Sequence, residues 1–213
     1  MSQQYLDYFY SRGLDEDIIK TFKLGWCNLK GKCSHHEFLP FVDNRFFNHV
    51  LFPIYNLHDD LISVSARSID ANNKNYIHTS YNKKDHLYGL NTTHFHILNS
   101  QKVYIVEGNF DLLTLYKNGI KNVVAMLGSN LSLSQVSLLV RFTNKLVLAS
   151  DGDDAGFKCR RNFIEMAKKN NISFNILKLP NGYDPDSYVK KYGAQSFLKL
   201  EQKDALQRIK EIL

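Results

Sequence analysis

The 213-residue sequence has few cysteines and no long apolar run, and these absences exclude several classes of protein. Three cysteines are too few, and odd in number, for a disulfide framework, which favours a reducing compartment. No apolar run approaches the ~18 residues that a membrane-spanning helix needs. The first residues, 1–7, lack the basic and then apolar layout of a signal peptide. The sequence therefore predicts a cytoplasmic protein.

The composition also excludes a disordered or low-complexity protein, because 44% of the residues are hydrophobic and 23% are charged. The net charge of +6 is unevenly distributed. Residues 1–100 hold 10 Lys and Arg and 10 Asp and Glu, whereas residues 101–213 hold 17 and 11. A basic balance of this kind fits a nucleic-acid partner, and it fits lysine-rich solvated faces equally well.

Two regions with different sequence rhythms divide the chain near residue 100. The first region predicts helices up to Gly13 and over 15–23, then two strands over 50–55 and 61–66. In the second region, short apolar strands alternate with helices, which predicts a parallel sheet covered by helices. The strands are expected at 103–106, 122–126, 146–149 and 174–179, and the helices at 110–117, 133–142 and 155–170. The predicted fold class is α+β, with a mixed α+β subdomain over 1–100 and an α/β domain over 101–213.

Acidic residues follow three of the predicted parallel strands. They are Glu107, Asp111, Asp151, Asp153, Asp184 and Asp186. Sites in open parallel sheets form beyond the carboxyl ends of the strands. If the first and third strands are neighbours, Glu107, Asp151 and Asp153 converge in one crevice.

Clustered carboxylates repel one another unless cations lie between them, and hard oxygen ligands suit Mg²⁺ or Mn²⁺. The alternative is that these acids cap the helices that follow, as Asp153 could for a helix starting at Ala155. Three acidic clusters at three strand ends favour the metal site over capping alone.

Other chemical motifs find less support. The sequence has no Gly-x-x-x-x-Gly-Lys-Ser/Thr phosphate loop and no Gly-x-Ser-x-Gly elbow. Cys27, Cys33, His35 and His36 could bind zinc, but their spacing differs from the common two-residue knuckle and favours a plain loop.

At this point the motifs carry a family resemblance. Glu107-Gly108-x-x-Asp111, Asp151-Gly152-Asp153-x-Ala155-Gly156 and Asp184-Pro185-Asp186 resemble the TOPRIM domain of bacterial DnaG-type primases. The acidic motifs alone would also fit topoisomerases, RecR-like proteins and TOPRIM nucleases. Segments upstream select the primases, because they resemble the N-terminal part of the primase core. These segments are 45–54, 65–67, 76–80 and 83–90.

The resemblance implies synthesis of short RNA primers from NTPs on a single-stranded DNA template. It implies that the six acids named above hold two or more Mg²⁺ or Mn²⁺ ions, with Glu107, Asp151 and Asp153 as the catalytic residues. It also implies a basic side that contacts template or nucleotide phosphates. The residues expected there are Arg45, Arg67, Lys74 and Lys83.

Departures from the family pattern leave fewer positively charged residues on this basic side. Phe47 and His49 stand where a second arginine and a third basic residue are usual, and Asn75 replaces a lysine. Asn109 replaces an aromatic residue after Glu-Gly. The family's zinc ribbon and helicase-binding domain have no counterpart in this sequence. We therefore expect a replicative helicase or a separate zinc-binding protein as partner. The sequence is expected to come from a phage or mobile element, or to be a shortened piece of a longer primase. Two rival functions remain, a TOPRIM nuclease and a nucleic-acid-binding accessory protein.

Overall fold

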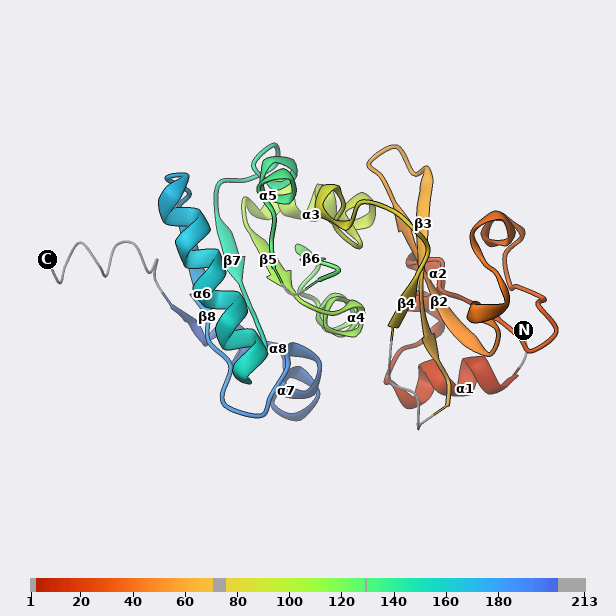
Figure 1. Ribbon diagram of the computed structural model, residues 1–213. Coiled ribbons are helices and arrows are strands. Elements are labelled where there is room, and N and C mark those ends of the chain that lie inside the picture. Colours follow the sequence, from red (N-terminus) through yellow and green to blue (C-terminus); the bar gives the residue numbers. More distant parts are fainter. Residues whose placement is uncertain (1–2, 71–75, 129, 203–213) are drawn as a thin grey trace, which may run out of the picture. The chain divides into compact units, whose positions relative to one another are not determined.

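The computed structural model describes residues 3–70, 76–128 and 130–202 (Figure 1). The chain divides into two compact units, residues 1–82 and residues 83–213. Each unit is built on its own sheet, so each is described separately.

Unit 1 has a four-stranded antiparallel sheet in the order β1-β2-β3-β4. The long hairpin of β2 and β3 is its centre, and all seven residues of β2 are buried. The elements are α1 (Gln3–Ser11), α2 (Glu16–Thr21), β1 (Gly25–Cys27), the 3₁₀ helices η1 (His36–Phe41) and η2 (Asn44–Phe46), β2 (His49–Tyr55), β3 (Leu61–Ser68) and β4 (Tyr76–His78). The two predicted helices and the predicted hairpin are confirmed.

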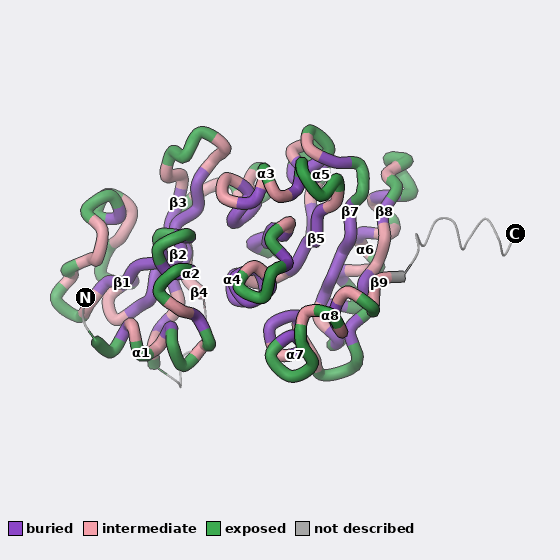
Figure 2. The backbone as a smooth tube through the Cα atoms, turned by 180° about the vertical axis from the view of Figure 1, so that it is seen from behind, coloured by how far each residue is buried: buried purple, intermediate pink, exposed green. Residues whose placement is uncertain are grey.

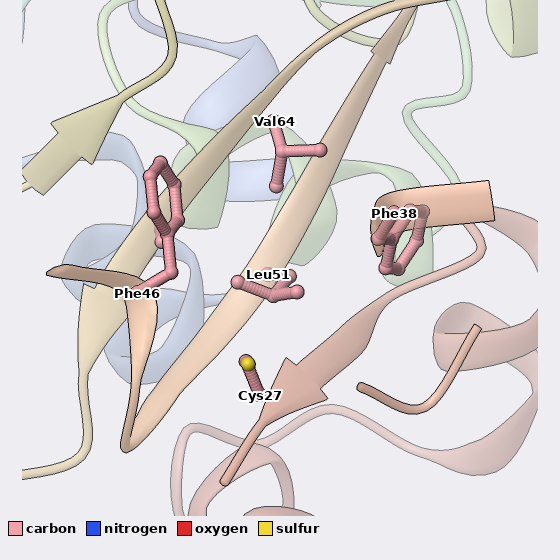
Figure 3. Packing of buried hydrophobic residues seen from close by; sticks show 6 residues of the cluster. Cys27, Phe38, Phe46, Leu51 and Val64 are labelled. Atoms are coloured by element: carbon pink, nitrogen blue, oxygen red, sulfur yellow. The ribbon is translucent and has the colours of Figure 1, made fainter. Parts of the chain in front are cut away.

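One core cluster joins the sheet of unit 1 to its 3₁₀ helices (Figure 3). Phe38 from η1 and Phe46 from η2 are fully buried against the sheet residues Leu51 and Val64. Burying a phenylalanine or leucine side chain stabilises the fold by about 2–3 kcal/mol. The stretch 28–46, which contains both 3₁₀ helices, is therefore anchored to the sheet by Phe38 and Phe46.

Unit 2 has a five-stranded sheet in the order β6-β5-β7-β8-β9. The first four strands are parallel, and β9 pairs antiparallel with β8. The elements are η3 (Lys83–Asp85), α3 (Leu90–Ser100), β5 (Val103–Val106), α4 (Asn109–Lys117), β6 (Val123–Ala125), α5 (Leu133–Leu139), β7 (Leu146–Leu148), α6 (Asp154–Lys169), β8 (Phe174–Leu177), α7 (Pro185–Tyr192), α8 (Ala194–Leu198) and β9 (Glu201–Gln202). The predicted parallel sheet and the α+β class are confirmed.

Strands β5, β6 and β7 are buried along their whole length (Figure 2). In α6, the buried residues Gly156, Cys159, Phe163 and Ala167 recur every three or four positions and form one helical face. No described helix is long and apolar enough to span a membrane.

The units divide at residues 82 and 83, whereas the sequence placed the boundary near residue 100. Helix α3, which the sequence pattern did not predict, packs against β6, and η3 packs against α5. Gly89 supplies the left-handed backbone, with φ of 79°, that lets the chain turn into α3. Residues 83–100 therefore belong to the parallel-sheet unit.

Candidate active site

The predicted convergence of acids depends on β5 and β7 being neighbours, and they are. The two strands pair in parallel, with Ile105 opposite Leu148. Their carboxyl ends therefore lie side by side, and the backbone N–H of Asp151 donates to Oε1 of Glu107 at 3.2 Å. This contact brings the first and second acidic motifs together.

A glycine contact joins the third acidic motif to the second. The N–H of Gly152 donates to the carbonyl of Tyr183 at 2.8 Å, and the N–H of Gly182 donates back to the carbonyl of Gly152 at 2.9 Å. A Cβ on Gly152 would lie 2.1 Å from the carbonyl oxygen of Pro180, so this close approach requires glycine. The pairing places Asp184 beside the loop that carries Asp151.

The carboxylates raise one another's pKa values. Burial, and then the charges of Asp151 and Asp184, raise the pKa of Asp111 well above its usual range. Burial also raises the pKa of Glu107, with a further contribution from Asp153. The backbone hydrogen bonds that Glu107 and Asp111 accept act in the opposite direction. Acidic residues from all three motifs therefore share one electrostatic environment.

Asp151 lies at the centre of this environment. Burial raises its pKa to about 7, and the charges of Glu107, Asp184 and Asp153 add to the shift. Its Oδ1 is buried and has no hydrogen-bond partner among the residues that the structure describes. A buried carboxylate oxygen without a donor is costly, and a bound cation would satisfy it.

Two of the predicted ligands also cap helices. Oδ1 of Asp153 accepts the N–H of Gly156 at 2.8 Å and starts α6, while Oδ1 of Asp184 accepts the N–H of Ser187 at 2.7 Å and starts α7. The capping alternative is therefore correct for one oxygen of each side chain. Capping leaves the second carboxylate oxygen and the negative charge of each side chain for another role.

The other two predicted ligands join α4 to α7. Asp111 is buried and accepts the N–H of Gly108 at 2.9 Å and that of Asp186 at 3.1 Å. Asp186 is also buried, forms an ion pair with Lys190 at 2.6 Å, and accepts the hydroxyl of Thr114. Both carboxylates are thus engaged by groups of the protein itself.

The donor set fits Mg²⁺ or Mn²⁺ held by few side chains. Within residues 3–70, 76–128 and 130–202, no three His, Cys, Asp or Glu side chains converge as a metal site. Mg²⁺, however, is usually held by one or two carboxylates, with water and phosphate oxygens completing the shell. Glu107 and Asp151, with the unpartnered Oδ1, meet that requirement.

Sequence reasoning missed Arg160, the cation of this site. Its guanidinium donates to the hydroxyl of Ser150 at 2.8 Å and to the carbonyl of Asp151 at 2.9 Å, and it lowers the pKa values of Asp151 and Glu107. Arg160 lies seven residues, or two helical turns, after Asp153. This spacing places the two residues on one helix face and could have indicated the contact.

A second residue that the sequence analysis missed is Gln135. It is buried, and its amide donates to the carbonyls of Lys83, His86 and Met126 at 2.7–3.1 Å. The Ser132-x-x-Gln135 spacing is that of a capping box, and the structure shows that box at the start of α5. Gln135 thereby anchors η3, which carries Lys83.

The predicted basic residues are distributed over both units. Arg45 pairs with Asp43 at 2.6 Å, and the guanidinium of Arg67 lies 5.2 Å from the ring centre of Tyr76; both arginines belong to unit 1. Lys83 belongs to unit 2, where partial burial lowers its pKa. Lys74 lies outside the described residues.

The candidate zinc ligands do not converge as a metal site within the described residues. Cys27 and Cys33 are adjacent, but Nδ1 of His35 lies 2.8 Å from the hydroxyl of Ser34, and its ring packs on Phe38.

The pKa of Asp151 predicts a pH-dependent stability. The folded protein holds the Asp151 proton up to about pH 7, whereas the unfolded chain releases it near pH ~4. Between these values the folded state binds more protons, so this group makes stability fall as pH rises. We expect Asp151→Asn to remove this contribution and to become more stable relative to the wild type as pH rises from 4 to 7.

Urea unfolding at several pH values in chelator measures this difference. Asp154→Asn is the matched control, because Asp154 is an exposed neighbour in the same turn. Parallel stability curves for the wild type and Asp151→Asn would contradict the raised pKa.

The chain is similar in sequence and in fold to known proteins. Residues 104–189 match the family described as Toprim-like. The chain is 30% identical to a DNA primase of Clostridium acetobutylicum over 91% of this chain and 36% of that protein. It superposes on a DnaG catalytic core with a TM-score of 0.81 and 27% identity, over 92% of this chain and 71% of that one. A DnaG catalytic domain bound to single-stranded DNA gives 0.80 and 27%, over 92% and 70%.

Unit 2 thus contains a Toprim-like domain with its acidic motifs at the carboxyl ends of a parallel sheet. The chain as a whole is a homologue of the catalytic core of DnaG-type DNA primases. It spans about a third of the length of the curated relative from Clostridium acetobutylicum.

Proposed function

We propose that this chain is the nucleotidyl-transfer core of a DNA primase, which joins NTPs into short RNA primers on single-stranded DNA. The main support is the acidic cluster at the carboxyl ends of β5 and β7, where the unpartnered Oδ1 of Asp151 lies among carboxylates whose pKa values are raised. Homology to DnaG catalytic cores supports the choice of reaction.

In this proposal Glu107, Asp151, Asp153 and Asp184 would hold the divalent ions, Mg²⁺ or Mn²⁺. Ions held there would supply positive charge at the reacting phosphate and at the leaving pyrophosphate. Asp153 and Asp184 combine this role with capping, so α6 and α7 start at the site and direct their N–H groups toward it. Asp111 and Asp186 keep α4 and α7 together beneath the site.

The nucleic-acid side of the proposal rests on the basic residues. Arg45, Arg67 and Lys83 would contact template or nucleotide phosphates, and Lys74 is expected to join them. The solved DnaG domain with single-stranded DNA supports this kind of partner. Because few cations are available, we propose that binding is weak and depends strongly on salt.

We further propose that the protein acts in the cytoplasm with partners. A replicative helicase or a zinc-binding protein would supply template selection, so primer synthesis by the purified chain should be low and rise when such a partner is added. Efficient, sequence-selective initiation by the chain alone would contradict this part of the proposal.

One assay tests the function itself. The purified protein is incubated with single-stranded DNA, labelled NTPs and Mg²⁺ or Mn²⁺. New short RNA supports primase activity. Shortened DNA would instead show a nuclease, and a retarded but unchanged template would show a binding protein.

The metal site can be tested separately from activity. Divalent ions that bind the folded chain raise its melting temperature with concentration. We expect Mg²⁺ or Mn²⁺ to raise the melting temperature of the wild type more than that of Asp151→Asn, because the variant lacks one carboxylate. In chelator the variant should be as stable as the wild type or more so, since one repelling charge is removed. Equal destabilisation of the variant in both conditions would contradict the metal site.

A further inference from the structure

Two of the three cysteines lie side by side in unit 1, whereas the carboxylate site belongs to unit 2. The Sγ atoms of Cys27 and Cys33 are 3.0 Å apart, and both residues are free thiols. Cys27 ends β1 and is fully buried, while Cys33 is half-buried after a short loop. The proposed primase function does not use either residue.

The backbone around the two cysteines has the geometry of a cross-strand disulfide. They form an isolated antiparallel bridge, with hydrogen bonds on either side of it. The N–H of Asn28 donates to the carbonyl of Lys32 at 3.0 Å, and that of Ser34 donates to the carbonyl of Trp26 at 2.9 Å.

The cysteines therefore occupy a non-hydrogen-bonded position, where Cα atoms are typically about 4.5 Å apart. A disulfide accepts Cα separations from about 4.4 to 6.8 Å. To form the bond, the sulfur atoms need to approach by about 1 Å, which side-chain rotation can supply without moving the backbone.

We propose that Cys27 and Cys33 are a site of reversible disulfide formation by exchange with a small-molecule disulfide. The thiolate of Cys33 attacks one sulfur of the small disulfide and displaces its other half as a thiolate. The thiolate of Cys27 then attacks the Cys33 sulfur and displaces the second half. Two cysteine thiols are oxidised, the small disulfide is reduced to two thiols, and these take up the two protons that the cysteines release.

The order of the two steps follows from burial. Cys33 has the more accessible sulfur, so it reacts first with the small disulfide. Cys27 is fully buried and therefore reacts only with the neighbouring Cys33. Burial raises the pKa of both thiols, that of Cys27 to about 12, so the exchange is slow near neutral pH and becomes faster as pH rises. Cys159 is buried in α6 of unit 2 and is also a free thiol.

Disulfide formation would fasten the base of an exposed loop. The loop carries Leu29, which is 72% exposed, together with Lys30 and Lys32. The side chain of Asn28 already accepts the N–H groups of both lysines, so the loop has a defined shape that the bond would lock. The single tryptophan, Trp26, is adjacent to Cys27 and reports on the reaction by fluorescence.

The experiment equilibrates the purified chain at pH 8.5 with a series of oxidised and reduced glutathione ratios. Remaining thiols are then alkylated and counted by mass spectrometry. We expect the wild type to change from three free thiols to one, with peptide mapping that links Cys27 to Cys33. The Cys159→Ser variant should lose the same two thiols. The Cys33→Ser variant should form no internal bond.

A comparison in denaturant keeps the test independent of reaction rate. If the fold favours the bond, disulfide formation should be at least about tenfold more favourable in the folded chain than in the same chain in urea. The oxidised wild type should also melt at a higher temperature than the reduced protein, while Cys33→Ser shows no such shift.

Three results would overturn the proposal. They are three alkylatable thiols in the folded wild type at every ratio, a stable mixed disulfide at Cys33 that never closes, and disulfide formation that is less favourable in the folded chain than in urea.

Discussion

Asp153→Asn is expected to reduce primer synthesis by about 10²–10³-fold, the usual cost of removing one group that stabilises charge in a transition state. The same substitution should leave the fold intact. Asparagine caps helices as well as aspartate does, so Oδ1 of residue 153 can still accept the N–H of Gly156. The variant therefore removes the negative charge and keeps the cap.

Two further variants isolate the charge from the cap. Asp154→Asn removes a carboxylate from the exposed next position and should keep wild-type activity. Asp153→Ala removes both charge and cap, so it should lose activity and also about 1 kcal/mol of stability. Initial rates of primer synthesis on single-stranded DNA and thermal melts of the wild type and the three variants measure both effects. Wild-type synthesis by Asp153→Asn would remove Asp153 from the proposed metal ligands.

Gly156→Ala is expected to destabilise the protein by about 2–4 kcal/mol. Helix propensity alone predicts the opposite sign, because alanine in a helix is better than glycine by about 1 kcal/mol. In the structure, a Cβ at Gly156 would lie 2.0 Å from the carbonyl oxygen of Asp151 and 2.9 Å from its N atom. These are backbone atoms, so the loop that carries the Asp151 carboxylate would have to move.

Gly128→Ala is the matched control for this prediction. A Cβ at Gly128 meets no atom within 4 Å, and the residue is exposed. We expect its stability to stay within about 0.5–1 kcal/mol of the wild type. Urea unfolding of the three proteins measures the differences. A stable Gly156→Ala protein would mean that α6 does not lie as closely against the Asp151 loop as the structure has it.

The close approach at Gly156 also shows why these glycines follow the strand. Glycines in such a position can leave room for a phosphate beside the backbone. In the structure, Gly152 and Gly156 make room for the protein's own carbonyls, at Pro180 and Asp151. Their first effect is thus to let the loop that carries Asp151 pack against the loop at Pro180 and against α6. That packing places the acidic residues of these segments near one another.

Much of the site could be read from the sequence by local rules. Short apolar strands alternating with helices predicted the parallel sheet, and acids directly after those strands predicted which side chains would gather at its edge. The Asp153 cap followed from an acid just before a helical pattern. Such features depend on neighbours along the chain, so the order of residues by itself determined them.

Only the tertiary structure decided which strands are adjacent and what each carboxylate does. β7 pairs with β5, and this long-range choice brings Asp151 to Glu107. Burial then separates the roles, because Asp111 receives backbone N–H groups while Oδ1 of Asp151 receives none.

Long-range packing likewise placed α3 with unit 2, where it contacts β6. Contacts of this kind arise when distant segments share a core. Their partners are therefore set by the packing of the whole unit, which no short window of sequence contains.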